Sequence, residues 1–151
     1  MRTILIINGP NLNMLGRRDP EQYGTMTMKS VLAKLHTRYN NEVRIDYFQS
    51  NHEGEIIDRI QQAYTDLRKE ACGIVLNAGA YTHTSLAIAD AIADCPLPVV
   101  EVHLSNVASR EPIRRTSLIG PCCVGSIAGF RADVYRLGVE ALLEITEELP
   151  F

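Results

Sequence analysis

The chain has 151 residues and a formal net charge of -3 at pH 7, with 46% hydrophobic and 22% charged residues. This composition is typical of one globular domain, here residues 1–151, and gives no basic surface for nucleic acid. The apolar runs fall well short of the roughly 20 residues that a membrane helix needs, and no signal-peptide pattern opens the chain. We therefore expect a cytoplasmic domain without a membrane or nucleic-acid partner.

The first predicted element is a strand over residues 3–8, where a continuous apolar run is typical of burial on both faces. The polar stretch that follows, residues 9–24, is rich in Gly, Pro and Asn. Connections between a strand and a helix usually take about 2 to 6 residues, and longer ones without structure of their own tend to be functional. We interpret residues 9–24 as a lid over a binding site.

Strands and helices then alternate to the end of the chain. Apolar residues at helical spacing predict helices over residues 27–40, 56–67, 84–94 and 134–149. Buried-strand patterns predict strands over residues 43–48, 71–78, 99–104 and 118–128. Thr27 is the expected N-cap of its helix, Leu67 and Leu149 are the last apolar members of theirs, and Pro121 favours an edge strand. The helix over 84–94 is apolar nearly all round, so a subunit interface could cover it.

Five strands alternating with helices predict an α/β fold, a flavodoxin-like doubly wound domain with a five-stranded parallel sheet and helices on both faces. Ligands of such folds bind beyond the carboxyl ends of the strands. Polar groups gather at these ends and predict a small, hydroxylated, anionic ligand. The set comprises Asn8, Gly9, Asn11, Asn51, His52, Asn77, Gly79, His83, Glu101, His103, Ser105, Asn106, Arg110 and Arg114.

Glu101 and His103 stand two residues apart on a predicted strand and so face the same side. A carboxylate beside an imidazole favours the imidazolium, which makes His103 a candidate general acid; a polar strand end with a satisfied histidine is the alternative. His83 has equal claims as a functional residue and as part of a helix-capping region. A metal site of His52, His83 and His103 is a weaker alternative, because no element carries a ligand pair at metal-binding spacing.

Arg17, Arg18 and Tyr23 lie in the predicted lid, where solvated side chains would be the ordinary interpretation. A free tyrosine is only about 0.1% ionised at pH 7, so a tyrosine base needs roughly 3 to 4 kcal/mol of help. One arginine about 4 Å away supplies ~1 kcal/mol in water and ~4 kcal/mol at an effective dielectric near 20. Tyr23 could therefore act as a base only beside an arginine under a closed lid.

Four segments with characteristic spacing follow one another along the chain, namely NGPNLNMLGRRDPEQYG, FQSNHEGEIID, NAGAYTHTSLAIADA and EVHLSNVASREPIRR. With them the chain resembles the type II dehydroquinases, the type II 3-dehydroquinate dehydratases, over essentially its whole length. The resemblance implies a hydro-lyase that reversibly converts 3-dehydroquinate to 3-dehydroshikimate through an enolate, in the shikimate pathway of aromatic amino acid biosynthesis. It also implies no metal or cofactor, and a homododecamer of four trimers. The alternatives are a catabolic quinate pathway role, another lyase or isomerase of cyclic polyol acids, and a non-catalytic flavodoxin-like binding module.

The resemblance assigns the catalytic steps to particular residues. Tyr23 would be the base, ionised with help from Arg18 and Arg110. His103, oriented by Glu101, would protonate the leaving hydroxyl.

Other residues would hold the substrate. Asn11 would keep a water that stabilises the enolate oxygen, and Asp90 would reach Arg114 of a neighbouring subunit. The remaining contacts would come from Asn77 with the backbone of Leu104 and Ser105, for the carboxylate, and from His83 and Arg114, for the ring hydroxyls.

Several positions depart from the commoner pattern of the family. Asp19 replaces Glu after the lid arginines, and Arg131 stands where Gly is frequent. Pro112, Ile113 and Thr116 occupy positions commonly held by an acidic residue, Phe and His. We expect these changes to affect lid packing and assembly, whereas every residue assigned to the chemistry is present.

Overall fold

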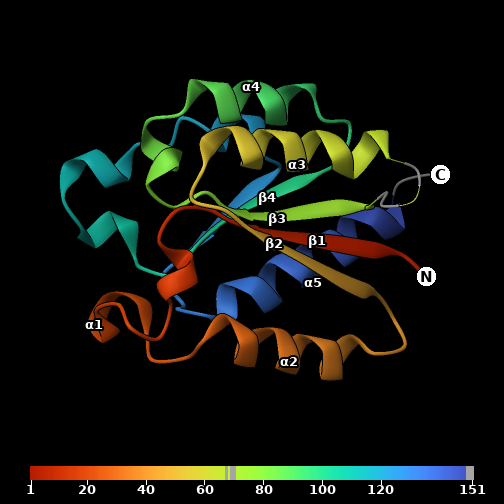
Figure 1. Cartoon of the computed structure of the whole chain (residues 1–151), viewed down its shortest axis with the longest axis horizontal. Helices are drawn as coiled ribbons and strands as arrows, with labels where there is room; N and C mark the ends of the chain where they lie inside the picture. Colours follow the sequence, from red (N-terminus) through yellow and green to blue (C-terminus); the bar gives the residue numbers. More distant parts are fainter. Residues whose placement is uncertain (67, 69–70, 149–151) are drawn as a thin grey trace.

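Five parallel strands form the centre of the structure, a computed structural model that describes residues 1–66, 68 and 71–148 (Figure 1). Leu67 and Leu149, expected at the ends of two helices, lie outside these described residues. The strands are β1 (Thr3–Asn8), β2 (Arg44–Gln49), β3 (Gly73–Asn77), β4 (Val99–His103) and β5 (Gly125–Ala128). Their order in the sheet is β2-β1-β3-β4-β5, which confirms the predicted doubly wound, flavodoxin-like arrangement.

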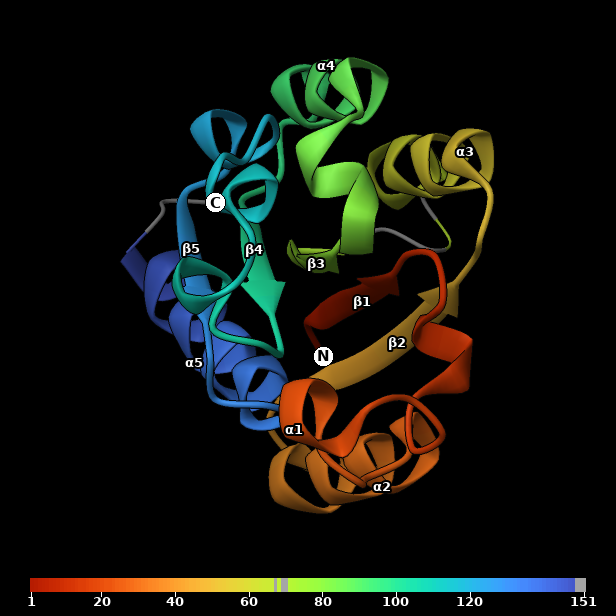
Figure 2. The same cartoon turned by 90° about the vertical axis from the view of Figure 1, so that its left-hand side faces the viewer.

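Helices cover both faces of this sheet (Figures 1 and 2). The main helices are α2 (Met28–Tyr39), α3 (Glu53–Thr65), α4 (Leu86–Asp94) and α5 (Asp133–Glu148). Helices α2 and α5 lie on one face, and α3 and α4 lie on the other. None of the helices within the described residues is long and apolar enough to cross a membrane.

Strand β1 shows why two apolar layers form. Ile4 and Ile6 belong to the cluster under α2 and α5, whereas Leu5 and Ile7 belong to the cluster under α3 and α4. Successive side chains of a strand point to opposite faces, so a continuous apolar run supplies both layers at once. All four side chains are fully buried. Burying each of these side chains stabilises the folded state by about 1.5 to 3 kcal/mol, so β1 contributes strongly to the stability of the domain.

Polar caps set where two of the helices begin. The Thr27 hydroxyl accepts a hydrogen bond from the Ser30 N–H, so α2 begins directly after Thr27, as predicted. Helix α4 begins at Leu86 rather than at the predicted residue 84, because the Ser85 hydroxyl accepts a hydrogen bond from the Ile88 N–H. The residues just before this cap form a 3-10 helix, Gly79–His83, which closes the end of β3.

The last strand is shorter than the sequence predicts. Strand β5 covers only Gly125–Ala128, and Gly120–Cys122 forms a 3-10 helix instead. Pro121 lies at the start of that helix, where its missing N–H costs nothing, so the expectation that it belongs to the strand is wrong. The edge position itself is confirmed, since β5 is the outermost strand beside β4.

The predicted lid, residues 9–24, contains two short helical segments. These are a 3-10 helix at Leu12–Met14 and α1 at Pro20–Tyr23. Leu12 and Leu15 are buried in the core under α2 and α5, and they anchor the first half of the lid. The Asp19 carboxylate caps α1 by accepting from the Glu21 N–H at 3.0 Å. Asp19, which stands where Glu is common in the family, therefore has a local structural role, because aspartate caps helices well.

Strands β1 and β3 lie side by side, and the strand order reverses at their carboxyl ends. We call this place the switch point. The Gly9 N–H donates to the Asn77 carbonyl at 2.7 Å. A Cβ on Gly9 would lie 2.6 Å from the Ala78 carbonyl oxygen, a backbone atom that cannot turn aside. Glycine is therefore required where the chain leaves β1 for the lid.

Gly9→Ala should destabilise the protein strongly. Overpacking of this kind typically costs about 1 to 3 kcal/mol, and we expect the upper part of that range in urea denaturation. Gly54→Ala is the matched control, because a Cβ on Gly54 meets nothing within 4 Å and alanine favours helices by up to about 1 kcal/mol. A Gly9→Ala variant as stable as the parent would contradict the close approach.

Candidate active site

A pocket of about 540 Å³, a volume that includes space open to solvent, lies at the switch point. Its walls come from the lid and from the chain that follows β3 and β4. It is lined by Pro10, Asn11, Leu12, Arg18, Tyr23, Asn77, Gly79, Ala80, His83, His103, Leu104, Ser105, Val107, Arg110 and Arg114. Of the residues to which the family resemblance assigns a catalytic or substrate-binding role, all line this pocket except Glu101 and Asp90.

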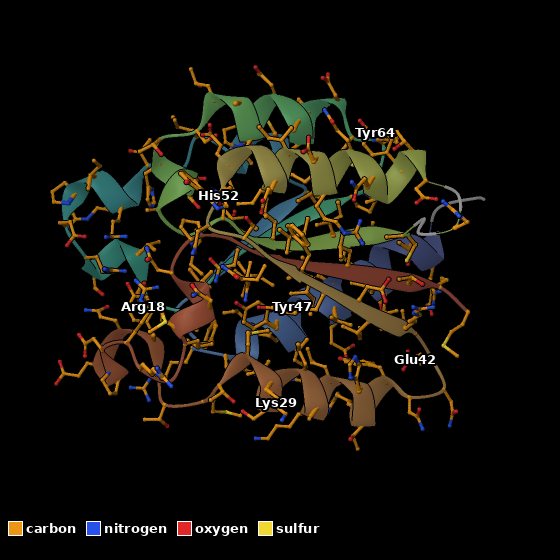
Figure 3. The ribbon with its side chains drawn as sticks, viewed as in Figure 1. Arg18, Lys29, Glu42, Tyr47, His52 and Tyr64 are labelled. Carbon is orange, nitrogen blue, oxygen red and sulfur yellow. The ribbon has the colours of Figure 1, made fainter. Side chains whose placement is uncertain are left out.

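Two arginines meet at the Tyr23 side chain. The Nη1 atom of Arg110 donates to the Tyr23 hydroxyl at 3.1 Å, and Cζ of Arg18 lies 3.8 Å from the centre of the tyrosine ring. Arg110 also donates to the Ser105 hydroxyl at 3.2 Å, which fixes its direction. Arg18 lies between α1 and the loop after β4 (Figure 3). Two guanidinium groups from different parts of the chain are therefore held against the same tyrosine.

Glu101 lies behind the pocket, where it contacts the ring of His103. Its Oε2 atom is 3.3 Å from Nε2 of His103 and accepts a hydrogen bond from Ser117 at 2.5 Å, and its Oε1 atom accepts one from Ser126 at 2.5 Å. Burial by itself raises the pKa of Glu101, but the hydrogen bonds from His103, Ser117 and Ser126 outweigh burial and lower it. The carboxylate is therefore ionised near neutral pH and can stabilise a charged imidazole.

The two histidines of the pocket have defined orientations. The Nε2–H of His103 is used by Glu101, so Nδ1 is the atom that can exchange a proton with a ligand. Nδ1 of His83 contacts the Thr116 carbonyl at 2.8 Å, and a carbonyl can only accept, so Nε2 of His83 is left for a ligand. The two rings stack with centres 6.3 Å apart. Since Ser85 caps α4, His83 is a pocket residue rather than a cap.

A buried hydrogen-bond network supports Asn77. Its Nδ2 atom donates to the Tyr135 hydroxyl at 3.2 Å, and that hydroxyl donates to Asn8 Oδ1 at 2.7 Å. Asn8 in turn donates to Tyr47, which projects from β2 on the side of α2 and α5 (Figure 3). Complete burial raises the pKa of Tyr135, so its hydroxyl stays protonated and keeps donating. Asn77 is thereby held in one orientation, with its second Nδ2 hydrogen left for a ligand.

Asn11 and Asn51 define the base of the lid. Asn11 has φ 69, in the left-handed region that asparagine tolerates. Its N–H donates to Asn51 Oδ1 at 3.0 Å, and Gln49 donates to the same oxygen at 3.3 Å. Asn51 was predicted among the polar residues at the strand ends, but it holds the lid backbone and does not line the pocket.

Other predicted residues lie outside the pocket or have additional partners. His52 directly precedes α3 (Figure 3) and does not line the pocket. Asp90 lies on the exposed side of α4, and Arg114 forms an ion pair with Glu111 within the chain. Within residues 1–66, 68 and 71–148, no group of three or more His, Cys, Asp or Glu side chains is arranged to hold a metal ion.

Three polar residues that were not predicted for the site support the pocket. Tyr135 belongs to the apolar stripe of α5, and nothing in the stripe reveals that its hydroxyl reaches Asn8 and Asn77. Ser117 belongs to a loop whose course the sequence does not indicate. Ser126 lies opposite Glu101 in the register of β5 with β4, a signal that would need the exact bounds of β5.

Known proteins resemble the chain closely. A family model described as "Dehydroquinase class II" matches residues 2–143. A 3-dehydroquinate dehydratase of Exiguobacterium sp. is 48% identical, with 93% of this chain and 94% of the relative covered. The crystal structure of type II dehydroquinase from Butyrivibrio crossotus has a TM-score of 0.88 at 41% identity, covering 94% of this chain and 97% of that one. That from Propionibacterium acnes has a TM-score of 0.86 at 36% identity, with 98% of both chains covered.

Glu101→Gln should destabilise the protein in a pH-dependent way. Because folding lowers the pKa of Glu101, its ionised form stabilises the folded state fully above the unfolded value near pH 4.3, and this stabilisation is lost as the pH falls through the lower folded value. Urea denaturation should show a loss of about 2 kcal/mol at pH 7 that shrinks toward pH 3. Glu144→Gln, at an exposed position of α5, is the control. A loss that stays constant from pH 7 to pH 3 would contradict the prediction.

Proposed function

This chain belongs to the class II dehydroquinase family and is a 3-dehydroquinate dehydratase, a hydro-lyase, and we propose that the pocket at the switch point is its active site. The reaction removes water from 3-dehydroquinate and leaves 3-dehydroshikimate. A proton next to the ketone is abstracted, an enolate forms, and the hydroxyl leaves as water. We assign this step to the shikimate pathway. The observation that carries the proposal is the hydrogen bond from Arg110 to the Tyr23 hydroxyl inside a pocket that His103 also lines.

Tyr23 is the proposed base. An unassisted tyrosine needs roughly 3 to 4 kcal/mol of help to ionise at pH 7. A guanidinium about 4 Å away supplies ~4 kcal/mol at an effective dielectric near 20 but only ~1 kcal/mol in water. The Arg110 side chain is only 13% exposed and Arg18 stacks on the ring, so both guanidinium groups are held against the tyrosine with little solvent around Arg110. The phenolate then takes the proton from the carbon beside the ketone.

His103 is the proposed acid for the second half of the reaction. Glu101 accepts from Nε2, which stabilises the imidazolium and leaves a proton on Nδ1 for the departing hydroxyl. Transfer of that proton releases water and restores a neutral imidazole. The proton that Tyr23 has gained and the one that His103 has lost balance over the cycle.

The remaining lining residues are proposed to bind and orient the substrate. The unused N–H of Asn77 and the backbone of Leu104 and Ser105 would hold the carboxylate. His83 and Arg114 would contact the ring hydroxyls, and a water held by Asn11 would stabilise the enolate oxygen. Such groups act mainly by fixing the reacting atoms in place and by placing dipoles where charge develops.

Tyr23→Phe tests the base. Purified protein is mixed with 3-dehydroquinate, and formation of the conjugated enone is followed by ultraviolet absorbance. We expect turnover by the parent and a roughly 10²- to 10⁴-fold lower kcat in Tyr23→Phe. Tyr64→Phe is the matched control, because Tyr64 lies on α3 on the far side of the sheet (Figure 3). A folded parent without signal would reject the reaction, whereas an active Tyr23→Phe would point to another base.

We further propose that the chain assembles as a homododecamer of four trimers. Leu86 is 67% exposed, a large value for a leucine, and Asp90 is exposed one turn later on the same face of α4. An apolar residue beside a carboxylate on one helix face suits a subunit contact. Asp90 would pair across this contact with Arg114 of the partner subunit.

Asp90→Ala should weaken assembly. Sedimentation velocity should show smaller species than the parent at the same concentration, and turnover should fall because the proposed partner of Arg114 is lost. Asp58→Ala, which removes an exposed carboxylate from α3, should leave both measurements unchanged. Unchanged sedimentation together with unchanged kinetics for Asp90→Ala would count against the contact.

A further inference from the structure

Arg131 has an unusual backbone conformation for a residue with a long side chain. Its φ is 49, and within the described part of the chain only Arg131 and Asn11 have positive φ without being glycine. Asparagine enters this region readily, whereas arginine does so only when its surroundings hold it there. The residue lies in the connection between β5 and α5 and is exposed. Its contacts should therefore explain why this strain is kept.

The backbone of Arg131 contacts one wall of the pocket. Its N–H donates to the Leu104 carbonyl at 2.9 Å, and the Gly129 N–H donates to the His103 carbonyl at 3.1 Å. The connection after β5 thus continues to pair with the chain after β4, beyond the end of both strands. This pairing fixes the backbone of Leu104, and the loop that carries Arg110 begins directly after it.

The side chain of Arg131 contacts the other wall. A Cβ built on Gly24 would lie 3.3 Å from Cδ, 3.8 Å from Cβ and 3.9 Å from Cγ of Arg131. The aliphatic part of the arginine therefore lies against Gly24, the residue that follows Tyr23 and ends the lid. Figure 2 shows the connection between β5 and α5 passing beside α1. Arginine stems commonly pack in this way while the charged end stays in water.

We propose that Arg131 is a positioning residue for Tyr23. Its N–H binds the Leu104 carbonyl on the β4 side of the pocket. Its aliphatic stem packs against Gly24, the last residue of the lid, and so holds the lid close to that side. Tyr23 directly precedes Gly24, so this contact keeps the Tyr23 hydroxyl at the Nη1 atom of Arg110. A short side chain at position 131 would keep the backbone hydrogen bond to Leu104 but lose the packing against Gly24. The inference rests on the proposed role of Tyr23 as the base.

Two substitutions at this position separate packing from charge. Arg131→Gly removes the stem and relieves the positive φ, so the variant should fold at least as well as the parent. Arg131→Met keeps an unbranched stem without the charge. We expect roughly tenfold lower kcat with little change in KM for Arg131→Gly, and kcat within about twofold of the parent for Arg131→Met, since small displacements of a reacting group slow catalysis strongly.

Limited trypsin digestion gives a readout that does not depend on turnover. Cleavage after Arg17 and Arg18 should be faster in Arg131→Gly than in Arg131→Met, and both variants lack the trypsin site at position 131, so they are directly comparable. Urea denaturation confirms that each variant is folded.

Three results would overturn the proposal. The first is equal kcat and equal trypsin sensitivity in both variants and the parent. The second is an Arg131→Met variant as slow as Arg131→Gly, which would assign the effect to charge. The third is a change in KM alone, which would assign it to substrate binding. If the parent did not turn over 3-dehydroquinate, the role of Tyr23 would fail, while trypsin would still decide whether Arg131 seats the lid.

Discussion

The backbone contact between Gly9 and Asn77 determines how the rest of the site is built. The chain leaves β1 with its N–H on the Asn77 carbonyl at 2.7 Å, closer to Ala78 than any side chain would allow. From there the lid begins directly over the end of β3. The Asn77 side chain and the 3-10 helix that ends at His83 therefore lie opposite Asn11 and Tyr23. A larger residue at position 9 would push these two walls apart and open the pocket.

The charged side chains in and behind the pocket differ in how deeply they are buried. Glu101 is almost fully buried and keeps its charge only because His103, Ser117 and Ser126 all donate to it. Arg18, from the lid, and Arg110, from the loop after β4, converge on Tyr23 from different parts of the chain. The hydrogen bond between Arg110 and Tyr23 joins residues 87 positions apart. The proposed acid and the proposed base are thus held by separate segments, which lets each be stabilised without neutralising the other.

Regular patterns made much of the fold predictable. Continuous apolar runs identified the core strands, apolar stripes identified the main helices, and Thr27 marked a helix start, because burial on a sheet or helix face imposes a period on the sequence. The pattern failed where it was irregular. Residues 118–128 are mostly apolar and read as one strand, yet Ser117 and Pro121 favour a 3-10 helix there, and pairing with β4 begins only at Gly125.

The sequence by itself determined the order of the elements, the place of the polar residues at the strand ends and the resemblance to a family. It could do so because these depend on local periodicity and on motifs that are continuous in the chain. Tertiary structure alone decided which polar residues face the pocket, since Asn51 turned out to hold the lid and Tyr135 to hold Asn77. It also placed Arg131 between both walls. Such contacts join segments far apart in the sequence, and their geometry exists only once strand register and helix packing are set.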